Sequence, residues 1–118
     1  MQHRQRVWET LAYIEQNLHR ELTLEELAGR AYLSKYYYHR LFRELTGEPV
    51  GRYITRRRLT LAARELTQTH HSVVEIALRC RFGSQEAFTR AFKRAYGCTP
   101  GQYRRLGTSG ASSIRMAA

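Results

Sequence analysis

The fold of this chain is decided by residues 23–54, TLEELAGRAYLSKYYYHRLFRELTGEPVGRYI, and by an echo of them at residues 72–103, SVVEIALRCRFGSQEAFTRAFKRAYGCTPGQY. The offset between the copies is 49 residues before a predicted turn and 50 after it, and a turn is where an extra residue is best tolerated. The repeated positions are Thr23, Glu26, Leu27, Ala28, Ala31, Ser34, Arg40, Phe42, Gly47, Gly51 and Tyr53, which match Ser72, Glu75, Ile76, Ala77, Cys80, Ser84, Arg90, Phe92, Gly97, Gly101 and Tyr103. Each copy therefore predicts a helix-turn-helix.

Capping signals place the helix ends in both copies. Each first helix opens with the spacing of a capping box, in which each of two side chains bonds the other residue's backbone N–H. Each second helix begins at a serine and ends at a glycine suited to the left-handed conformation. These residues are Thr23 with Glu26, Ser72 with Glu75, Ser34, Ser84, Gly47 and Gly97. The side chains expected to fill the space between the helices are Ala28, Ala77, Tyr38, Leu41, Phe42, Leu45, Ala87, Phe88, Ala91, Phe92 and Ala95.

The segments outside the repeat complete an all-α architecture of two helix-turn-helix subdomains joined by a long linker helix, with about seven helices in all. Apolar positions at helical spacing predict a helix over residues 5–18, with Trp8 and Tyr13 widening its buried stripe. A linker helix over residues 49–68 spans roughly 30 Å, and a short helix follows over residues 99–105. The predicted boundaries are residues 1–48 for the N-terminal subdomain, 49–69 for the linker helix, 70–106 for the C-terminal subdomain and 107–118 for a disordered tail.

The composition favours a polyanionic partner. The 118 residues carry 20 Lys and Arg against 10 Asp and Glu, and the net charge of +10 suits nucleic acid or an acidic membrane surface. No apolar run is long enough to span a bilayer and the opening MQHRQR is not a signal peptide, so a cytoplasmic location is expected. Cys80 and Cys98 have no partner at metal-binding spacing, and we expect two small core thiols, no disulfide and no metal.

The outer face of each second helix carries side chains that can read bases in a major groove. A helix-turn-helix inserts this face into the groove. Arg is suited to guanine, Gln to adenine, and Glu to the amino group of cytosine. The candidate base contacts are Tyr36, His39 and Arg40 in the first copy and Gln85, Glu86, Thr89 and Arg90 in the second.

Helix starts and nearby cations supply candidate phosphate contacts, which position a protein without reading sequence. They are Ser34, Lys35, Arg43, Gly51, Arg52, Tyr53, Ser84, Lys93, Arg94, Gly101, Gln102 and Tyr103. Successive major grooves on one face of a duplex lie about 34 Å apart, which is the order of length of the linker helix. We therefore expect one monomer to bind double-stranded DNA at an asymmetric, bipartite site.

A resemblance to a known family is carried by residues 22–59, LTLEELAGRAYLSKYYYHRLFRELTGEPVGRYITRRRL, and residues 72–105, SVVEIALRCRFGSQEAFTRAFKRAYGCTPGQYRR. These residues resemble the AraC/XylS transcription activators, and above all the family's single-domain branch. The resemblance implies a monomeric activator of degenerate promoter sites that recruits RNA polymerase through the sigma factor and through the C-terminal domain of the polymerase alpha chain. It also implies a bacterial, nucleoid-associated protein with no cofactor. Targets in that branch include efflux, porin-regulating and oxidative-stress genes.

The chain departs from the family pattern at several recognition positions. The branch commonly has Trp at position 36, Gln at positions 39 and 86, and Thr at position 87, so the base preference is expected to differ. Turn positions that usually hold Gly are filled by Tyr32 and Arg81. A positive φ there costs on the order of 1 kcal/mol each, and Gly83 is expected to relieve the second turn.

Several features admit two interpretations. The tyrosines at 36–38 suit a stacking platform for single strands, or a core Tyr38 beside an outward Tyr36 and a partly exposed Tyr37. His39 is a groove contact or a polar surface residue, and Glu86 is a base contact or a helix cap. Two motifs remain open: the arginines at 56–58, as a phosphate stripe or a solvated face, and His70-His71, as a metal or pH-sensing site or a helix C-terminal cap.

Three competing functions are weakly supported. No nucleophile–base arrangement and no Gly-rich phosphate loop occur in the sequence, so an enzyme is not expected. A nonspecific nucleoid or architectural protein, the main alternative, needs charge without patterned recognition helices. A polymerase adaptor that does not bind DNA needs grouped acidic residues, and here they are scattered among the caps. The pattern favours a sequence-specific regulator of transcription with no small-molecule ligand evident in this chain.

Overall fold

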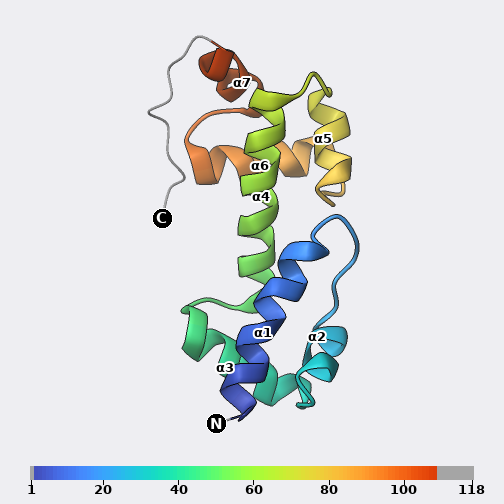
Figure 1. Cartoon of the computed structure of the whole chain (residues 1–118). Coiled ribbons are helices and arrows are strands. Elements are labelled where there is room, and N and C mark those ends of the chain that lie inside the picture. Colours follow the sequence, from blue (N-terminus) through green and yellow to red (C-terminus); the bar gives the residue numbers. More distant parts are fainter. Residues whose placement is uncertain (1, 109–118) are drawn as a thin grey trace. The chain divides into compact units, whose positions relative to one another are not determined.

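The computed structural model describes residues 2–108, and this part of the chain forms seven α-helices and no strand (Figure 1). The predicted all-α class is therefore confirmed. The helices are α1 (Gln2–Gln16), α2 (Leu24–Arg30), α3 (Lys35–Thr46), α4 (Val50–Gln68), α5 (Val73–Arg79), α6 (Gln85–Tyr96) and α7 (Pro100–Thr108). The chain divides into two compact units, one ending at Arg57 and the other beginning at Arg58, so α4 supplies residues to both.

The first unit packs α1, α2 and α3 against one another around a buried aromatic pair. Tyr38 and Phe42 of α3 are fully buried, and Phe42 meets Tyr53 of α4 edge-on with ring centroids 5.4 Å apart. The hydroxyl of Tyr38 lies 2.8 Å from Thr10 Oγ1 of α1, so this core contains a satisfied polar pair. The other buried apolar side chains of the unit are Val7, Ile14, Leu18, Leu27, Ala28, Ala31, Leu41, Val50 and Ile54.

The second unit repeats this arrangement with an all-apolar core. Phe88 and Phe92 of α6 are fully buried, and Phe92 meets Tyr103 of α7 edge-on at 5.3 Å. The cores thus share one geometry, built on a tyrosine and a phenylalanine in the first unit and on two phenylalanines in the second. Cys98 is half-buried. The other members of the core cluster are Leu59, Ala62, Ala63 and Leu66 of α4, with Ile76, Ala77 and Cys80.

The prediction that Trp8 widens the buried stripe of the first helix is wrong. Trp8 is 52% exposed, and the residue of this helix that is buried beside Val7 and Ile14 is Thr10. Successive residues of a helix turn by about 100°, so the face that holds Val7 and Ile14 admits Thr10 and excludes Trp8. Thr10 tolerates burial because its hydroxyl is hydrogen-bonded to Tyr38 and to the carbonyl of Val7.

Three helix boundaries also differ from prediction, and the first is the start of α1, at Gln2 and not at residue 5. α1 ends at Gln16, since the Asn17 side chain donates to the carbonyl of Tyr13 at 2.8 Å and its backbone N–H bonds Ile14, closing the last turn. α7 runs to Thr108, so residues 107 and 108, predicted to open a disordered tail, are helical. The rest of that tail, 109–118, lies outside the described residues.

The caps predicted for the two helix-turn-helix units are confirmed. The glycines after α3 and α6, Gly47 and Gly97, have φ angles of 86° and 82°. The Glu26 carboxylate binds Arg20 and Tyr13, and a hydrogen bond from the backbone of Thr23 also contributes to lowering its pKa. A complete capping box starts α7, where Thr99 and Gln102 bond each other's backbone N–H at 2.9 and 3.2 Å. The side chains that accept from the N–H three residues on, at 3.1–3.2 Å, are Thr23, Ser34, Ser72 and Ser84.

Each helix-turn-helix turn contains a non-glycine residue in the left-handed conformation, Tyr32 with φ 58° and Arg81 with φ 68°. In both turns the following N–H bonds the carbonyl five residues earlier at 2.9 Å, a Schellman pattern that demands this conformation. The expected strain, on the order of 1 kcal/mol per residue, is therefore present in both turns. Gly83 does not relieve it, because Arg81 and not Gly83 has the positive φ.

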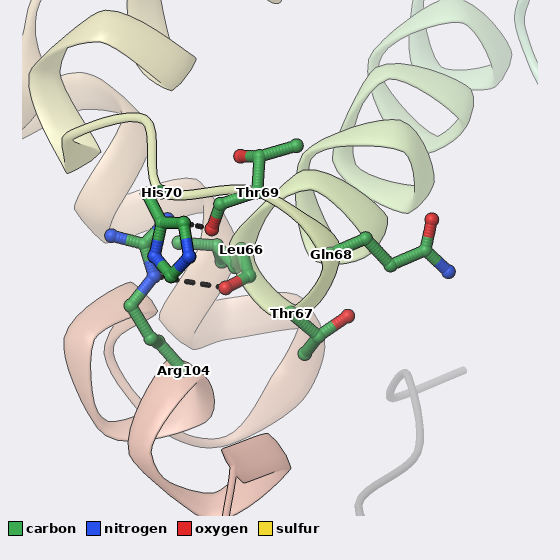
Figure 2. Close-up of a pocket in the computed structure, with 6 residues that line it drawn as sticks. All are labelled: Leu66, Thr67, Gln68, Thr69, His70 and Arg104. Atoms are coloured by element: carbon green, nitrogen blue, oxygen red, sulfur yellow. Dashed lines mark hydrogen bonds between the residues drawn. The ribbon is translucent and has the colours of Figure 1, made fainter.

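The C-terminal end of α4 is capped by Arg104 of α7, and the predicted cap by His70-His71 is wrong (Figure 2). The guanidinium donates to the carbonyls of Leu66, Thr69 and His71 at 2.8, 3.4 and 2.6 Å. A helix end leaves such carbonyls without helical partners, so a cation there satisfies hydrogen bonds and the helix dipole together. Arg104 and residues 66–70 line a cavity of about 190 Å³.

Candidate nucleic-acid interface

Of the candidate base contacts of the first copy, Tyr36 and Arg40 lie on the side of α3 opposite its buried aromatic pair, and His39 lies between the two sides. Tyr36 is 76% exposed, Arg40 is exposed and His39 is half-buried. Tyr37 is 38% exposed and Tyr38 is fully buried, so the three tyrosines do not form one stacking platform. These three candidate base contacts offer one aromatic ring, one imidazole and one guanidinium, and Arg43 adds a second exposed guanidinium to α3.

The candidate base contacts of the second copy line a single surface hollow. Gln85, Glu86, Thr89 and Arg90 surround an open concavity of about 510 Å³ on α6. Gln85, Glu86 and Arg90 are exposed, and Thr89 is half-buried. Ser84 Oγ, not the Glu86 carboxylate, accepts the N-terminal hydrogen bond of this helix, from Ala87. This arrangement leaves the Glu86 carboxylate at the rim of the hollow.

The two equivalent arginines differ in their ion pairs. Arg40 Nε lies 3.6 Å from Glu44 Oε2, and Arg4 Nη1 of α1 lies 3.7 Å from the other oxygen of that carboxylate. Position 94, which corresponds to Glu44, is an arginine. Within residues 2–108, Arg90 has no ion pair. Glu44 thus holds the guanidinium of the first recognition helix, and no carboxylate of the described residues holds the second.

Some of the candidate phosphate contacts are already engaged within the protein, and the others are exposed. Ser34 and Ser84 accept at helix starts but keep an O–H to donate, and Lys35 lies 3.7 Å from Glu25. The rings of Tyr53 and Tyr103 are packed against phenylalanine, and Gln102 is engaged in its capping box, so these three have structural roles already. Gly101 is half-buried. The exposed remainder are Arg43, Gly51, Arg52, Lys93 and Arg94.

Two of the arginines at 56–58 form ion pairs within the first unit, so the run is not simply a solvated face. Arg56 donates to Glu48 at 2.7 Å and Arg57 to Glu15 of α1 at 2.8 Å, so both tie α4 to the first unit. Arg58 belongs to the second unit and is half-buried.

One polar cluster of the first unit was not foreseen from the sequence. The Glu26 carboxylate binds both the Arg20 guanidinium and the Tyr13 hydroxyl, and Arg30 stacks 3.8 Å from the centre of the Tyr13 ring. The hydrogen bond from Arg20, followed by that from Tyr13, lowers the pKa of Glu26 to about 2. A capping-box spacing concealed this role, since both roles use the same carboxylate.

Two alternatives for the basic surface find no support within residues 2–108. No helix there combines the length and apolar character of a membrane crossing. No group of three or more His, Cys, Asp or Glu side chains is gathered there that could hold a metal ion. His71 Nδ1 lies 3.5 Å from the Glu65 carboxylate, and Arg79 Nε lies 3.1 Å from the same oxygen. His71 is therefore next to a single carboxylate that is already paired with an arginine.

Two capped helix pairs, each with a left-handed turn and an outward face of polar, groove-compatible side chains, define a double helix-turn-helix DNA-binding protein. Similar proteins lead to the same class. Residues 27–106 match the model of a helix-turn-helix domain family. The chain resembles the crystal structure of the DNA-binding domain of AdpA in complex with a target DNA, with a TM-score of 0.84 and 33% identity over 92% of this chain and 97% of that one.

Relatives of known class narrow the family. The transcriptional activator AarP of Providencia stuartii is 42% identical over 96 residues, covering 81% of this chain and 71% of AarP. The transcriptional regulator Rob of Salmonella typhimurium is 41% identical over 105 residues, covering 89% of this chain but only 36% of Rob. The chain belongs to the AraC-type helix-turn-helix family of transcription regulators, as the resemblance predicted. It is a sequence-specific DNA-binding regulator and not an enzyme.

Proposed function

We propose that this protein binds a bipartite promoter site as a monomer, with α3 in one major groove and α6 in the next, and activates transcription by recruiting RNA polymerase. The bases are contacted by Tyr36, His39, Arg40, Gln85, Glu86, Thr89 and Arg90. In this proposal the linker helix joins two recognition helices that bind different base sequences. Because the internal repeat is tandem, the two half-sites are read in the same direction and not as a palindrome.

The observation that carries the proposal is the outward face that both recognition helices present from matching frames. α3 and α6 have the same cap, the same closing glycine and the same buried aromatic pattern, yet different exposed side chains. Two faces that differed only in charge would suit nonspecific binding, whereas two faces with distinct hydrogen-bonding groups suit two distinct base sequences. The duplication also supplies two readers in one chain, which removes the need for a dimer.

The recruitment of polymerase and the location are proposed from the relatives. AarP is an activator and Rob a regulator of transcription, both bacterial. We propose that this chain acts in the cytoplasm, at the nucleoid, on genes of the stress or drug-resistance class. Its polymerase contacts are proposed to be the sigma factor and the C-terminal domain of the polymerase alpha chain.

The test is selection of bound duplexes from a random pool at physiological salt, followed by sequencing. Enrichment of two unlike blocks with centres about one helical turn, roughly 10 base pairs, apart is the expected result. A single block limits base reading to one unit. Tight binding without enrichment contradicts the proposal and favours the alternative, an architectural protein bound by its charge of +10.

A further inference from the structure

The two turns hold large side chains where the backbone favours glycine. Tyr32 and Arg81 are equivalent by the repeat, both have positive φ, and both project into solvent, with Tyr32 81% exposed. Neither side chain contributes to a core. Glycine would occupy these positions without strain, so core packing does not account for the large side chains found there.

A second cost acts on Arg81. Burial lowers the pKa of Arg58 on α4, and the positive charge of Arg81 lowers it further, which shows that the two cations lie close enough to repel. Within residues 2–108 Arg81 has no carboxylate partner. An exposed cation that strains the backbone and repels its neighbour is unfavourable in the isolated protein. A bound anion would reverse the second of these effects, since it attracts both guanidinium groups.

The first turn also has a guanidinium beside it, but this group comes from another helix. The guanidinium of Arg6, from α1, lies over the Tyr32 ring with Cζ 5.6 Å from its centroid. The aromatic face holds the cation beside the turn by a cation–π interaction. Each turn therefore has a guanidinium next to the start of its recognition helix: Arg81 itself in the second unit and Arg6 on Tyr32 in the first.

We propose that the two turns are additional DNA contacts, in which Arg81 and the Tyr32-supported Arg6 each bind a backbone phosphate beside the groove entered by the recognition helix. Guanidinium groups match phosphate oxygens in a bidentate geometry. The inference rests on the proposed function in one respect, that α3 and α6 lie against duplex DNA. Phosphate contacts carry no base preference, so these residues strengthen binding to every sequence alike.

Two substitutions at position 81 separate the charge from the backbone. Arg81→Gln removes the charge and keeps the side chain in the left-handed turn, whereas Arg81→Gly removes both. With the selected duplex as probe, both variants are expected to raise Kd about three- to tenfold and to reduce the slope of log K against log salt by about 1. Both variants remove the repulsion of Arg58, and Arg81→Gly is expected to have a Tm about 2–8 °C above that of Arg81→Gln, because glycine also relieves the backbone strain.

Arg64→Gln is the matched control, since it removes another exposed guanidinium of the same unit that the proposal leaves off the interface. In the first turn, Tyr32→Phe keeps the ring and is expected to bind as the wild type does. Tyr32→Ala is expected to weaken binding about two- to fivefold through the loss of support for Arg6. If Arg81→Gln matches Arg64→Gln in both Kd and salt slope, the phosphate contact is overturned.

The same titrations on an unselected random duplex separate this inference from the proposed function. A contact to phosphate lowers the salt slope of Arg81→Gln on both duplexes. If the wild type enriches no sequence but Arg81→Gln still lowers the slope on random duplex, base reading fails and the turn contact stands. If the wild type enriches a site and the slope is unchanged on both duplexes, base reading stands and the turn contact fails.

Discussion

The two recognition helices, α3 and α6, share their caps and their packing geometry but differ in their buried and exposed side chains. Each begins at a serine cap, ends at a left-handed glycine, and buries an aromatic pair that meets a tyrosine edge-on. Inside, the first unit has a hydrogen-bonded tyrosine where the second has Phe88. Outside, Arg40 is paired with Glu44 while Arg90 is not paired in the described residues. The frame thus tolerates changes on both faces as long as caps and volumes are kept.

The largest expected effect comes from a position where the two units differ in both residue type and role. The repeat pairs Arg104 with Ile54, which is buried in the first unit, whereas Arg104 closes the end of α4. Arg104→Ala leaves several carbonyls without a donor and is expected to lower the free energy of unfolding by about 1.5–3 kcal/mol. Urea denaturation measures this, with the exposed Arg105→Ala as control. An equal loss in the two variants would mean that the cap contributes nothing.

Exchanging the core hydroxyl between the units is the next test. Phe88→Tyr places a hydroxyl in an all-apolar cluster and is expected to cost roughly 1–3 kcal/mol, since no partner equivalent to Thr10 is packed there among the described residues. Tyr38→Phe is expected to cost only about 0.5–1.5 kcal/mol, because Thr10 keeps its bond to the carbonyl of Val7. Burial raises the pKa of Tyr38 to about 12, so the hydroxyl is protonated throughout such a measurement. Equal costs would contradict the asymmetry of the two cores.

How much of this frame could be predicted depends on the sequence distance over which each contact acts. The caps, the closing glycines and the buried faces of α3 and α6 were predicted, because each depends on residues within a turn or two of the helix. The Arg104 cap was missed, since its acceptors lie 33 to 38 residues earlier in the chain.

The same limit applies to the candidate site. The outward faces of α3 and α6 follow from helical spacing, and they were predicted. The pairing of Thr10 with Tyr38, 28 residues apart, was not, and Trp8 was placed inside because it is apolar. The link between Arg4 and Glu44 was missed for the same reason: a pattern within one helix does not show which residue of another helix faces it.

The outer faces are compared by two alanine substitutions. Arg40→Ala and Arg90→Ala are each expected to weaken binding by about 1–3 kcal/mol and to relax base preference at one position. The loss is expected to be smaller for Arg40, because its guanidinium must leave Glu44 to reach a base. Binding titrations on the selected duplex and its single-base variants check both effects. Uniform weakening over all variants would reassign the arginine to a phosphate.

The smallest effect is expected from acid, and it concerns the first unit alone. The pKa of Glu26 in the folded protein is about 2, below its ordinary value of 4.5, so its contribution to stability is full above pH 4.5 and is lost as the pH falls toward 2. The difference in unfolding free energy between the wild type and Glu26→Gln is expected to shrink as the pH falls over that range. Urea titrations at a series of pH values measure it, with Glu75→Gln as the matched control. A constant gap would exclude the Arg20 pair as a source of acid sensitivity.

The cap on α4 has a consequence for synthesis of the chain on the ribosome. The first unit ends at Arg57, but the end of α4 lacks the Arg104 donor until that residue has been added, 38 residues after Leu66. At ordinary translation speeds this is a delay of roughly 2–8 s. The first unit can therefore fold while the second is still being made. Truncated chains stalled before residue 104 are expected to present a folded first half and a second half open to proteases.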